Sequence, residues 1–176
     1  MKNWWLWIVG AVILMRAATR KKDDMRISKN FRLQEFVTEA DLAKGVDFNT
    51  LENIYQLVTQ VLQPMRDRVG FPIKVTSAYR DPARNAAIGG VADSQHIYGM
   101  AADIQPIPNT LENYRSMWSA IRLGPYDQLI WENAKYDTQR PSHLHVSHVG
   151  APKSKYITNR YNRYELFNGQ YRKLNA

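Results

Sequence analysis

The chain contains no cysteine among its 176 residues. Without thiols it cannot build a disulfide framework, a thiolate zinc finger or an iron–sulfur centre, and it has no cysteine nucleophile. Any bound metal ion must therefore be held by His, Asp or Glu side chains. Histidine is scarce as well, because the chain has only four: His96, His143, His145 and His148. The search for chemistry begins with these four residues.

Long hydrophobic runs are nearly absent, and the one that stands out is residues 4–15 (WWLWIVGAVILM). It is shorter than the roughly 20 residues that cross a bilayer as a helix. The run lies between Lys2 and a basic cluster that begins at Arg16, a pattern typical of a membrane anchor or of the apolar part of a secretory signal. Because Arg16 interrupts the small residues that a cleavage site needs, we favour the anchor and keep the cleaved signal as the alternative. Residues 1–24 are thus predicted to form an anchor or signal segment with a basic linker, and residues 4–15 to contact a membrane.

The net charge of +8 is not spread evenly along the chain. Residues 1–24 carry five basic and two acidic side chains, and residues 151–176 carry six basic and one acidic. The body between them, residues 25–150, has 13 of each sign and no net charge. A basic groove for nucleic acid is therefore not expected. We predict one monomeric domain over residues 25–150, followed by a basic, Tyr-rich tail that wraps the domain or contacts a polyanion.

The clearest helical pattern covers residues 51–65, where apolar residues recur at spacings of three and four. Asn49 is the predicted N-cap, and Glu52 three residues later completes a capping box. Pro64 predicts a kink or a break near the end of this helix. Gly70 lies where the pattern stops.

The remaining elements are shorter. Asp81 and Pro82 predict the start of a short helix, and a repeat of the capping signature at Asn109 predicts a second one that runs to Ile121. Alternating or apolar β-rich segments predict four strands, over residues 73–77, 100–104, 127–131 and 143–149. Helices and strands are interspersed without regular βαβ spacing, so we predict an α+β fold with a small, largely antiparallel sheet flanked by helices.

Candidate ligand residues occur in two places. His96 and Asp103 lie seven residues apart, and Gly99 lets the chain turn between them. His143 and His145 share one face of a predicted strand, whereas His148 faces the opposite way and fits a structural role. Two His and one Asp can hold a catalytic zinc ion and leave its fourth position open. On spacing alone a metal site and purely structural histidines stay open, although a carboxylate in an apolar run favours a buried cation partner.

Four segments of the chain together resemble a known family, the zinc D-alanyl-D-alanine carboxypeptidases and the related L-alanyl-D-glutamate endopeptidases of phage lysins and bacterial walls. The resemblance spans about residues 31–149, in the order expected for the family. The segments are 77–80 (SAYR), 94–103 (SQHIYGMAAD), 127–132 (DQLIWE) and 143–147 (HLHVS). The resemblance implies a single metallopeptidase domain that cuts peptide bonds in peptidoglycan stem peptides containing D-residues.

The resemblance also implies roles for individual residues. It makes His96, Asp103 and His145 the ligands of a zinc ion. Arg80 would clasp a substrate carboxylate, a task that suits its planar guanidinium. Beside Arg80, the predicted substrate-binding set contains three further residues: Tyr79, Ser94 and Gln95. Ser94 and Gln95 would also orient the loop that carries His96.

One departure from the family concerns the catalytic base. Many members have a Glu three residues before the last His ligand, and this chain has Ser142 there. His143 and Glu132 are the two predicted replacements, and we favour His143 because it shares a strand face with His145. Loss of activity is the third interpretation, and it would make the domain a catalytically silent module that binds the cell wall.

Overall fold

The computed structural model describes residues 25–149 and 160–174. The predictions for residues 1–24, including membrane contact through residues 4–15, lie outside the described residues. In the two described ranges, no helix combines the length and the apolar character needed to cross a membrane.

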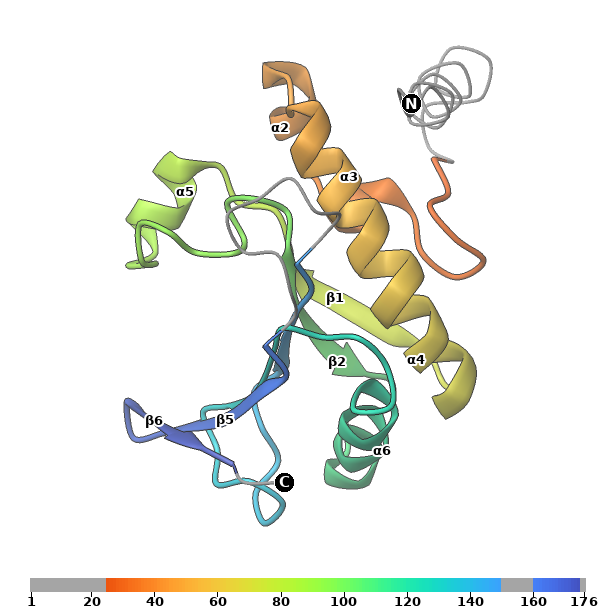
Figure 1. Cartoon of the computed structure of the whole chain (residues 1–176), viewed down its shortest axis with the longest axis vertical. Helices are drawn as coiled ribbons and strands as arrows, with labels where there is room; N and C mark the ends of the chain where they lie inside the picture. Colours follow the sequence, from red (N-terminus) through yellow and green to blue (C-terminus); the bar gives the residue numbers. More distant parts are fainter. Residues whose placement is uncertain (1–24, 150–159, 175–176) are drawn as a thin grey trace.

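Six strands form one sheet, in the order β1-β2-β4-β3-β5-β6. All neighbouring strands pair antiparallel except β3 and β5, which are parallel. The prediction of an α+β fold with a largely antiparallel sheet is therefore confirmed (Figure 1). The strands are β1 (Ile73–Ser77), β2 (Ala101–Pro106), β3 (Gln128–Glu132), β4 (Leu144–Ser147), β5 (Asn162–Phe167) and β6 (Gln170–Lys173).

The strands β5 and β6 were not predicted. They lie in the described part of the basic tail, where the sequences NRYELF and QYRK lack a clear alternation of apolar and polar residues. Most of their side chains are half-buried or exposed, so the sequence lacks the regularly spaced apolar residues by which a buried strand is predicted. Pairing with β3 adds this hairpin to the edge of the sheet.

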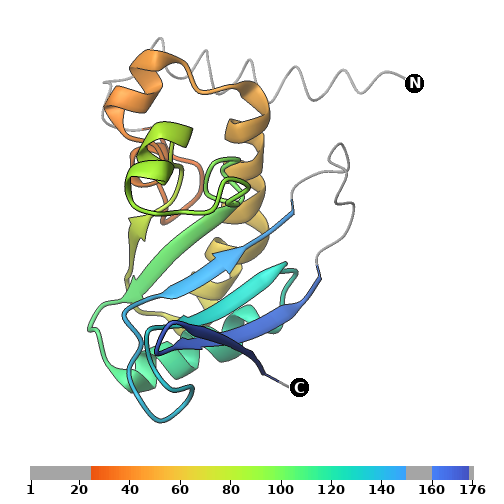
Figure 2. The same cartoon turned by 90° about the vertical axis from the view of Figure 1, so that its left-hand side faces the viewer.

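Among the described residues, the large helices cover only one face of the sheet (Figure 1 and Figure 2). The long helical stretch, made of α3 (Phe48–Leu57), a π-helical turn (Val58–Leu62) and α4 (Gln63–Val69), lies beside α6 (Leu111–Ile121) on one side of the strands. Figure 2 shows the sheet in front of these helices. The smaller helices are a 3-10 turn (Leu33–Glu35), α2 (Glu39–Lys44) and α5 (Pro82–Ala87). The buried core lies between the sheet and the large helices and includes Leu57, Leu62, Met65, Ile104, Tyr114, Met117, Leu129, Trp131 and Leu144.

The helix start predicted at Asp81 and Pro82 is confirmed, whereas the other two predicted starts were displaced by one or two residues. Asn49 is not the N-cap of α3; Asp47 is, and its side chain accepts a hydrogen bond from the Thr50 backbone N–H. Asn109 likewise gives way to Thr110, which caps α6. Each segment offers more than one residue able to cap, and the chain's entry direction decides which is used. The break predicted at Pro64 is wrong: α3, the π-helical turn and α4 follow one another without a gap, and Pro64 lies in the first turn of α4, downstream of the π-helical turn.

Strand register places the polar residues on the open face. Asp103 on β2 pairs with Ser77 on β1 and with His145 on β4, and His145 pairs with Ile130 on β3. Side chains alternate along a strand, so Ala102 and Ile104 face the core while Asp103 faces the other way. The fold thus gathers a row of side chains on the face that the large helices do not cover.

Candidate metal centre

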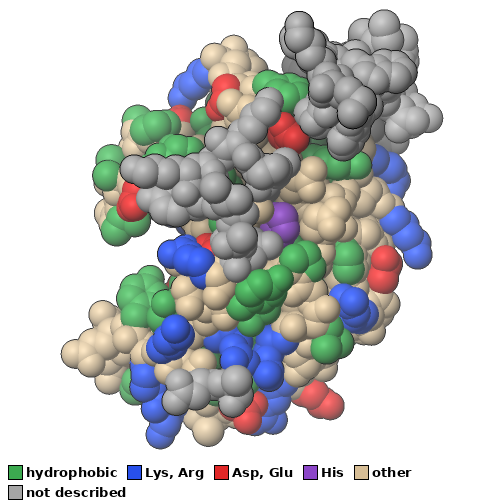
Figure 3. Space-filling view, viewed as in Figure 1, with side chains coloured by type: hydrophobic (Ala, Val, Ile, Leu, Met, Phe, Trp, Pro, Cys, Tyr) green, Lys and Arg blue, Asp and Glu red, His purple; other side chains and the backbone are tan. Residues whose placement is uncertain are grey.

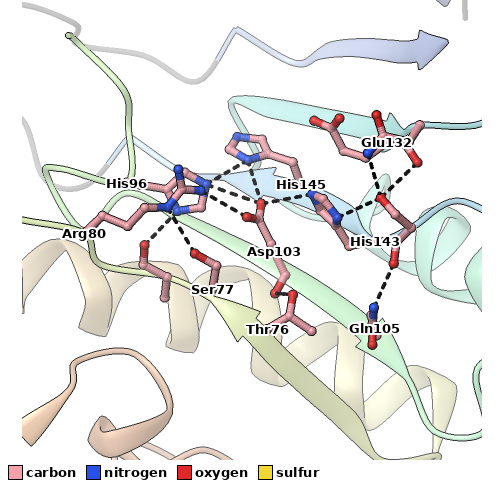
Figure 4. A network of polar contacts seen from close by, with 12 residues as sticks. Thr76, Ser77, Arg80, His96, Asp103, Gln105, Glu132, His143 and His145 are labelled. Carbon is pink, nitrogen blue, oxygen red and sulfur yellow. Dashed lines mark hydrogen bonds and ion pairs between the residues drawn. The ribbon is translucent and has the colours of Figure 1, made fainter. Parts of the chain in front are cut away.

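Three potential ligand atoms meet on the open face of the sheet. His96 Nε2 lies 3.2 Å from His145 Nδ1 and 3.3 Å from Asp103 Oδ1, and His145 Nδ1 lies 3.1 Å from the same Asp103 oxygen. His96 comes from the loop between α5 and β2, Asp103 from β2 and His145 from β4, as Figure 4 shows. All three side chains are largely buried. The two sequence segments predicted to converge therefore do so.

The donor set fits a tetrahedral divalent ion. A zinc ion with bonds of about 2.0 Å to N and O ligands keeps neighbouring ligand atoms about 3.3 Å apart, close to the sides of the observed triangle. Within the described residues, His96, Asp103 and His145 form the one group of three potential ligands whose atoms lie within 4.8 Å of one another. Three protein ligands leave one coordination position for water or substrate.

A hydrogen bond to the backbone sets the tautomer of His96 that a metal ligand needs. Its Nδ1 lies 2.7 Å from the carbonyl oxygen of Ala78. Because a carbonyl only accepts, Nδ1 carries the hydrogen and Nε2 keeps a lone pair that points into the triangle. Burial lowers the pKa of His96, although the Asp103 carboxylate opposes that shift. The imidazole is therefore neutral at physiological pH, as a metal ligand must be.

Asp103 is held as a carboxylate. Burial alone would raise its pKa, but the imidazoles of His145 and His96 beside it outweigh burial and place the pKa well below its usual range. Its second oxygen, Oδ2, accepts a hydrogen bond of 3.1 Å from Arg80 Nη2. Arg80 Nε in turn donates to Ser77 Oγ at 3.1 Å. The predicted substrate residue Arg80 is thus also the partner that fixes the orientation of Asp103.

His143 lies next to the triangle. Its Nε2 is 3.6 Å from Asp103 Oδ1, and its Nδ1 is 2.9 Å from Ser142 Oγ. The Ser142 hydroxyl donates to the Glu132 carbonyl oxygen, so it accepts from His143 Nδ1–H. This leaves a lone pair on Nε2, facing the site. Burial lowers the pKa of His143, with Asp103 opposing.

Glu132, the other predicted base, ends β3 on the same side of the sheet. Its side chain is buried, and none of the described residues forms a hydrogen bond or ion pair with its carboxylate. Burial raises its pKa; the nearby His145 opposes this and Asp103 adds to it. A carboxyl group with a raised pKa and no partner at the edge of a site is a candidate for proton transfer.

The predicted substrate residues line two different cavities. Arg80, Ser94 and Gln95 line the cavity of about 500 Å³ that contains the triangle, His143 and Glu132. Tyr79 instead lines a neighbouring cavity of about 300 Å³. His148, predicted to be structural, is buried and does not line the metal cavity.

Sequence reasoning missed Asp127, whose fully buried carboxylate ties the site to the C-terminal strands. Arg160 Nη2 donates to its Oδ2 at 2.6 Å, and the Arg160 backbone N–H donates to its Oδ1 at 2.8 Å. Gln95 Nε2, beside His96, donates to Oδ2 at 2.8 Å. Asp127 therefore holds the His96 loop and the chain that enters β5 together. This role could not be predicted from the sequence, because the main partner of Asp127 is Arg160, which lies 33 residues away in a tail without a recognisable pattern.

We expect Asp127→Asn to destabilise the fold by about 2 kcal/mol at neutral pH, because an amide has no negative charge and keeps only one of the two oxygens that accept from Arg160. Burial alone would raise the pKa of Asp127, but hydrogen bonds from Arg160 and Gln95 lower it overall. The stabilisation is therefore present above the unfolded pKa of about 3.9 and is lost as the pH falls through the lower, folded value. Urea unfolding should show a gap between variant and wild type that is large at pH 7 and shrinks in strong acid. Asp137→Asn is the control, since Asp137 pairs with Arg115 in solvent; a gap independent of pH would contradict the account.

Gly99 makes the predicted turn between His96 and Asp103. Its φ is +68°, and a Cβ atom there would lie 2.7 Å from the Thr50 carbonyl oxygen. We expect Gly99→Ala to cost roughly 2–4 kcal/mol of unfolding free energy, from the left-handed backbone and from the clash together. Gly45→Ala is the matched control, because Gly45 has φ +86° and open space around it. Equal losses for the two variants in urea unfolding would show that the contact with Thr50 does not matter.

A protein-family model described as Peptidase M15 matches residues 29–136. This range includes His96, Asp103 and Glu132, and it ends before His143 and His145. A search of curated proteins found no match.

Proposed function

Since the chain belongs to the peptidase M15 family, we propose that it is a zinc-dependent peptidase that cleaves peptide bonds in peptidoglycan stem peptides containing D-residues. The observation that carries the proposal is the triangle of His96, Asp103 and His145 in the wall of a cavity of about 500 Å³. The family supplies the reaction class, hydrolysis of a peptide bond. The donor set supports a metal as its cofactor.

The site has the parts that hydrolysis needs. A zinc ion bound there would lower the pKa of water towards neutrality and polarise the scissile carbonyl. His96 Nε2 and His145 Nδ1 offer nitrogen donors, and Asp103 offers the anionic oxygen. Arg80 holds the second oxygen of Asp103, which restricts the carboxylate to one orientation.

We assign proton transfer to His143. Its Nε2 lone pair faces the site because Ser142 Oγ accepts the hydrogen on Nδ1. The imidazole can take a proton from the attacking water and return it to the leaving amine. Glu132 is the alternative base: it lines the same cavity, and its raised pKa is favourable for exchanging a proton near neutral pH.

Substrate recognition is assigned to the cavity wall around Arg80. Arg80 lines the cavity, and a planar guanidinium suits a carboxylate, the group that ends or branches from a stem peptide. Ser94 and Gln95 lie on the same wall. Gln95 is anchored to Asp127, so we assign it the positioning of the His96 loop.

The test is mass spectrometry of purified muropeptides incubated with the full chain, in the presence of zinc and after chelation. We expect cleavage products with zinc, none after chelation, and recovery when zinc is restored. The masses of the products identify the bond. Equal cleavage with and without the chelator would contradict the metal mechanism, and no cleavage after zinc restoration would contradict the peptidase.

A second candidate is a wall-binding module that retains the fold without turnover. The observation that favours it is Ser142, at the position where many family members carry Glu. Sedimentation with intact sacculi distinguishes the two functions. Tight binding that releases no soluble fragment would favour the module, whereas release of fragments favours the enzyme.

A further inference from the structure

The cavity that contains the metal triangle has one wall outside the part matched by the family model. Its lining includes Tyr171 on β6, 35 positions beyond the end of that match. Figure 3 shows the surface hollowed between the region of α5 and the region of β6. A chain lying across the metal site would therefore pass between the loop after α5 and the C-terminal hairpin.

Strand register explains how Tyr171 reaches the site. Glu132 on β3 pairs with Leu166 on β5, and Leu166 pairs with Tyr171 on β6. Paired residues point to the same face of a sheet, so Tyr171 shares the open face with Glu132, Asp103 and His145. The parallel pairing of β3 with β5 is thus what brings a residue from the tail to the cavity.

The Tyr171 ring is held in place and still accessible. It packs edge-on against Tyr164 on β5, with ring centroids 6.3 Å apart. Its exposed fraction is 63%, which is high for a residue in a cavity wall. Partial burial, together with the carboxylates of Glu132 and Asp103, raises the pKa of the phenol. The hydroxyl therefore keeps its hydrogen at neutral pH and can donate it.

We propose that Tyr171 is a substrate-contacting residue, whose ring packs against the stem peptide on the Glu132 side of the site and whose hydroxyl donates a hydrogen bond to a peptide carbonyl. The inference rests on the proposed function and adds one binding contact to it. An exposed aromatic ring with two side-chain torsions offers a large contact area at small entropic cost. A peptide supplies both partners that Tyr171 needs, apolar surface and an acceptor.

The test compares Tyr171→Ala and Tyr171→Phe with wild type, using a free stem tetrapeptide and the same peptide linked to its disaccharide. We expect Tyr171→Ala to raise KM roughly 30-fold and Tyr171→Phe to raise it about threefold, with kcat changed little, since the ring is lost in one variant and only the hydroxyl in the other. Kd for the tetrapeptide, measured by calorimetry on metal-free protein, should shift in parallel. Gln170→Ala, on the opposite face of β6, is the control.

The outcomes separate this inference from the proposed function. Wild-type protein that binds the tetrapeptide but never cleaves it would overturn the peptidase, while the Kd values would still decide the role of Tyr171. KM and Kd values for Tyr171→Ala within twofold of wild type would overturn the Tyr171 contact, and so would failure of wild type to bind the tetrapeptide. A loss seen only with the disaccharide-linked substrate would also overturn it, because the contact would then be to sugar. Thermal unfolding of each variant shows whether the hairpin is intact, and Tyr171→Phe retains the ring contact with Tyr164.

Discussion

Replacing His145 by alanine is expected to abolish zinc binding at the site and to lower kcat/KM for muropeptides by roughly 10³-fold or more. His145 Nδ1 lies 3.1 Å from Asp103 Oδ1 and 3.2 Å from His96 Nε2, so its removal leaves two ligands in place of three. Two side chains neither hold the ion tightly nor fix its open position. The measurements are zinc content after gel filtration and initial rates of muropeptide cleavage.

His148→Ala is the matched control for this variant. It removes an imidazole three residues further along the chain, from a residue that is buried but does not line the metal cavity. We expect this control to keep its zinc and its rate. If His145→Ala retains one equivalent of zinc and wild-type turnover, the triangle is not the metal site.

His143→Ala is expected to retain zinc and to lose about 10²–10⁴ in kcat, the usual contribution of a positioned general base. The physical reason is that His143 Nε2 faces the site from outside the ligand triangle, 3.6 Å from Asp103 Oδ1. Loss of the imidazole therefore removes the proton acceptor without removing a ligand. Zinc content and kcat, measured on the same preparation, separate the two roles.

Glu132→Gln completes this comparison. It keeps the shape of the side chain and removes its ability to accept a proton, so we expect a much smaller loss of kcat than for His143→Ala. The reverse order of effects would assign the base to Glu132, whose raised pKa suits the same task. Loss of zinc from His143→Ala would instead show that His143 is a ligand.

Local patterns were sufficient to predict the elements that carry the triangle. Asp103 follows two alanines and precedes Ile104, so a strand with one polar residue facing away from the core was readable from the sequence. For the same reason His143 and His145 were predicted to share a strand face, and both line the cavity, although His143 lies one residue before β4. Gly99 is needed where φ is +68°, and it was identified as the turn.

What could not be predicted depends on contacts between distant segments. The pairing of β5 with β3 joins Leu166 to Glu132 across 34 positions and brings Tyr171 to the cavity. The hydrogen bonds between Arg160 and Asp127 span 33 positions. Neither segment carries a periodic apolar pattern, because the tail covers the edge of the sheet and buries few of its side chains. Long-range pairing of this kind leaves no local signal.

The same limit applies to single residues. Both Asp47 and Asn49 can cap a helix, and only the path of the chain before α3 selects Asp47. Arg80 was predicted to bind a substrate carboxylate, yet nothing near it in the sequence indicates that its Nη2 donates to Asp103, 23 residues away. Its substrate role stays a prediction, to which the structure adds a positioning contact.

The central claim is that His96, Asp103 and His145 bind one divalent ion, and anomalous scattering at the zinc absorption edge tests it most directly. Crystals of the full chain grown with one equivalent of zinc should show a single strong anomalous peak about 2.0–2.2 Å from His96 Nε2, Asp103 Oδ1 and His145 Nδ1. A peak bound by other residues, or no peak in crystals of protein with an intact sheet, would contradict the assignment of this site as a metal centre.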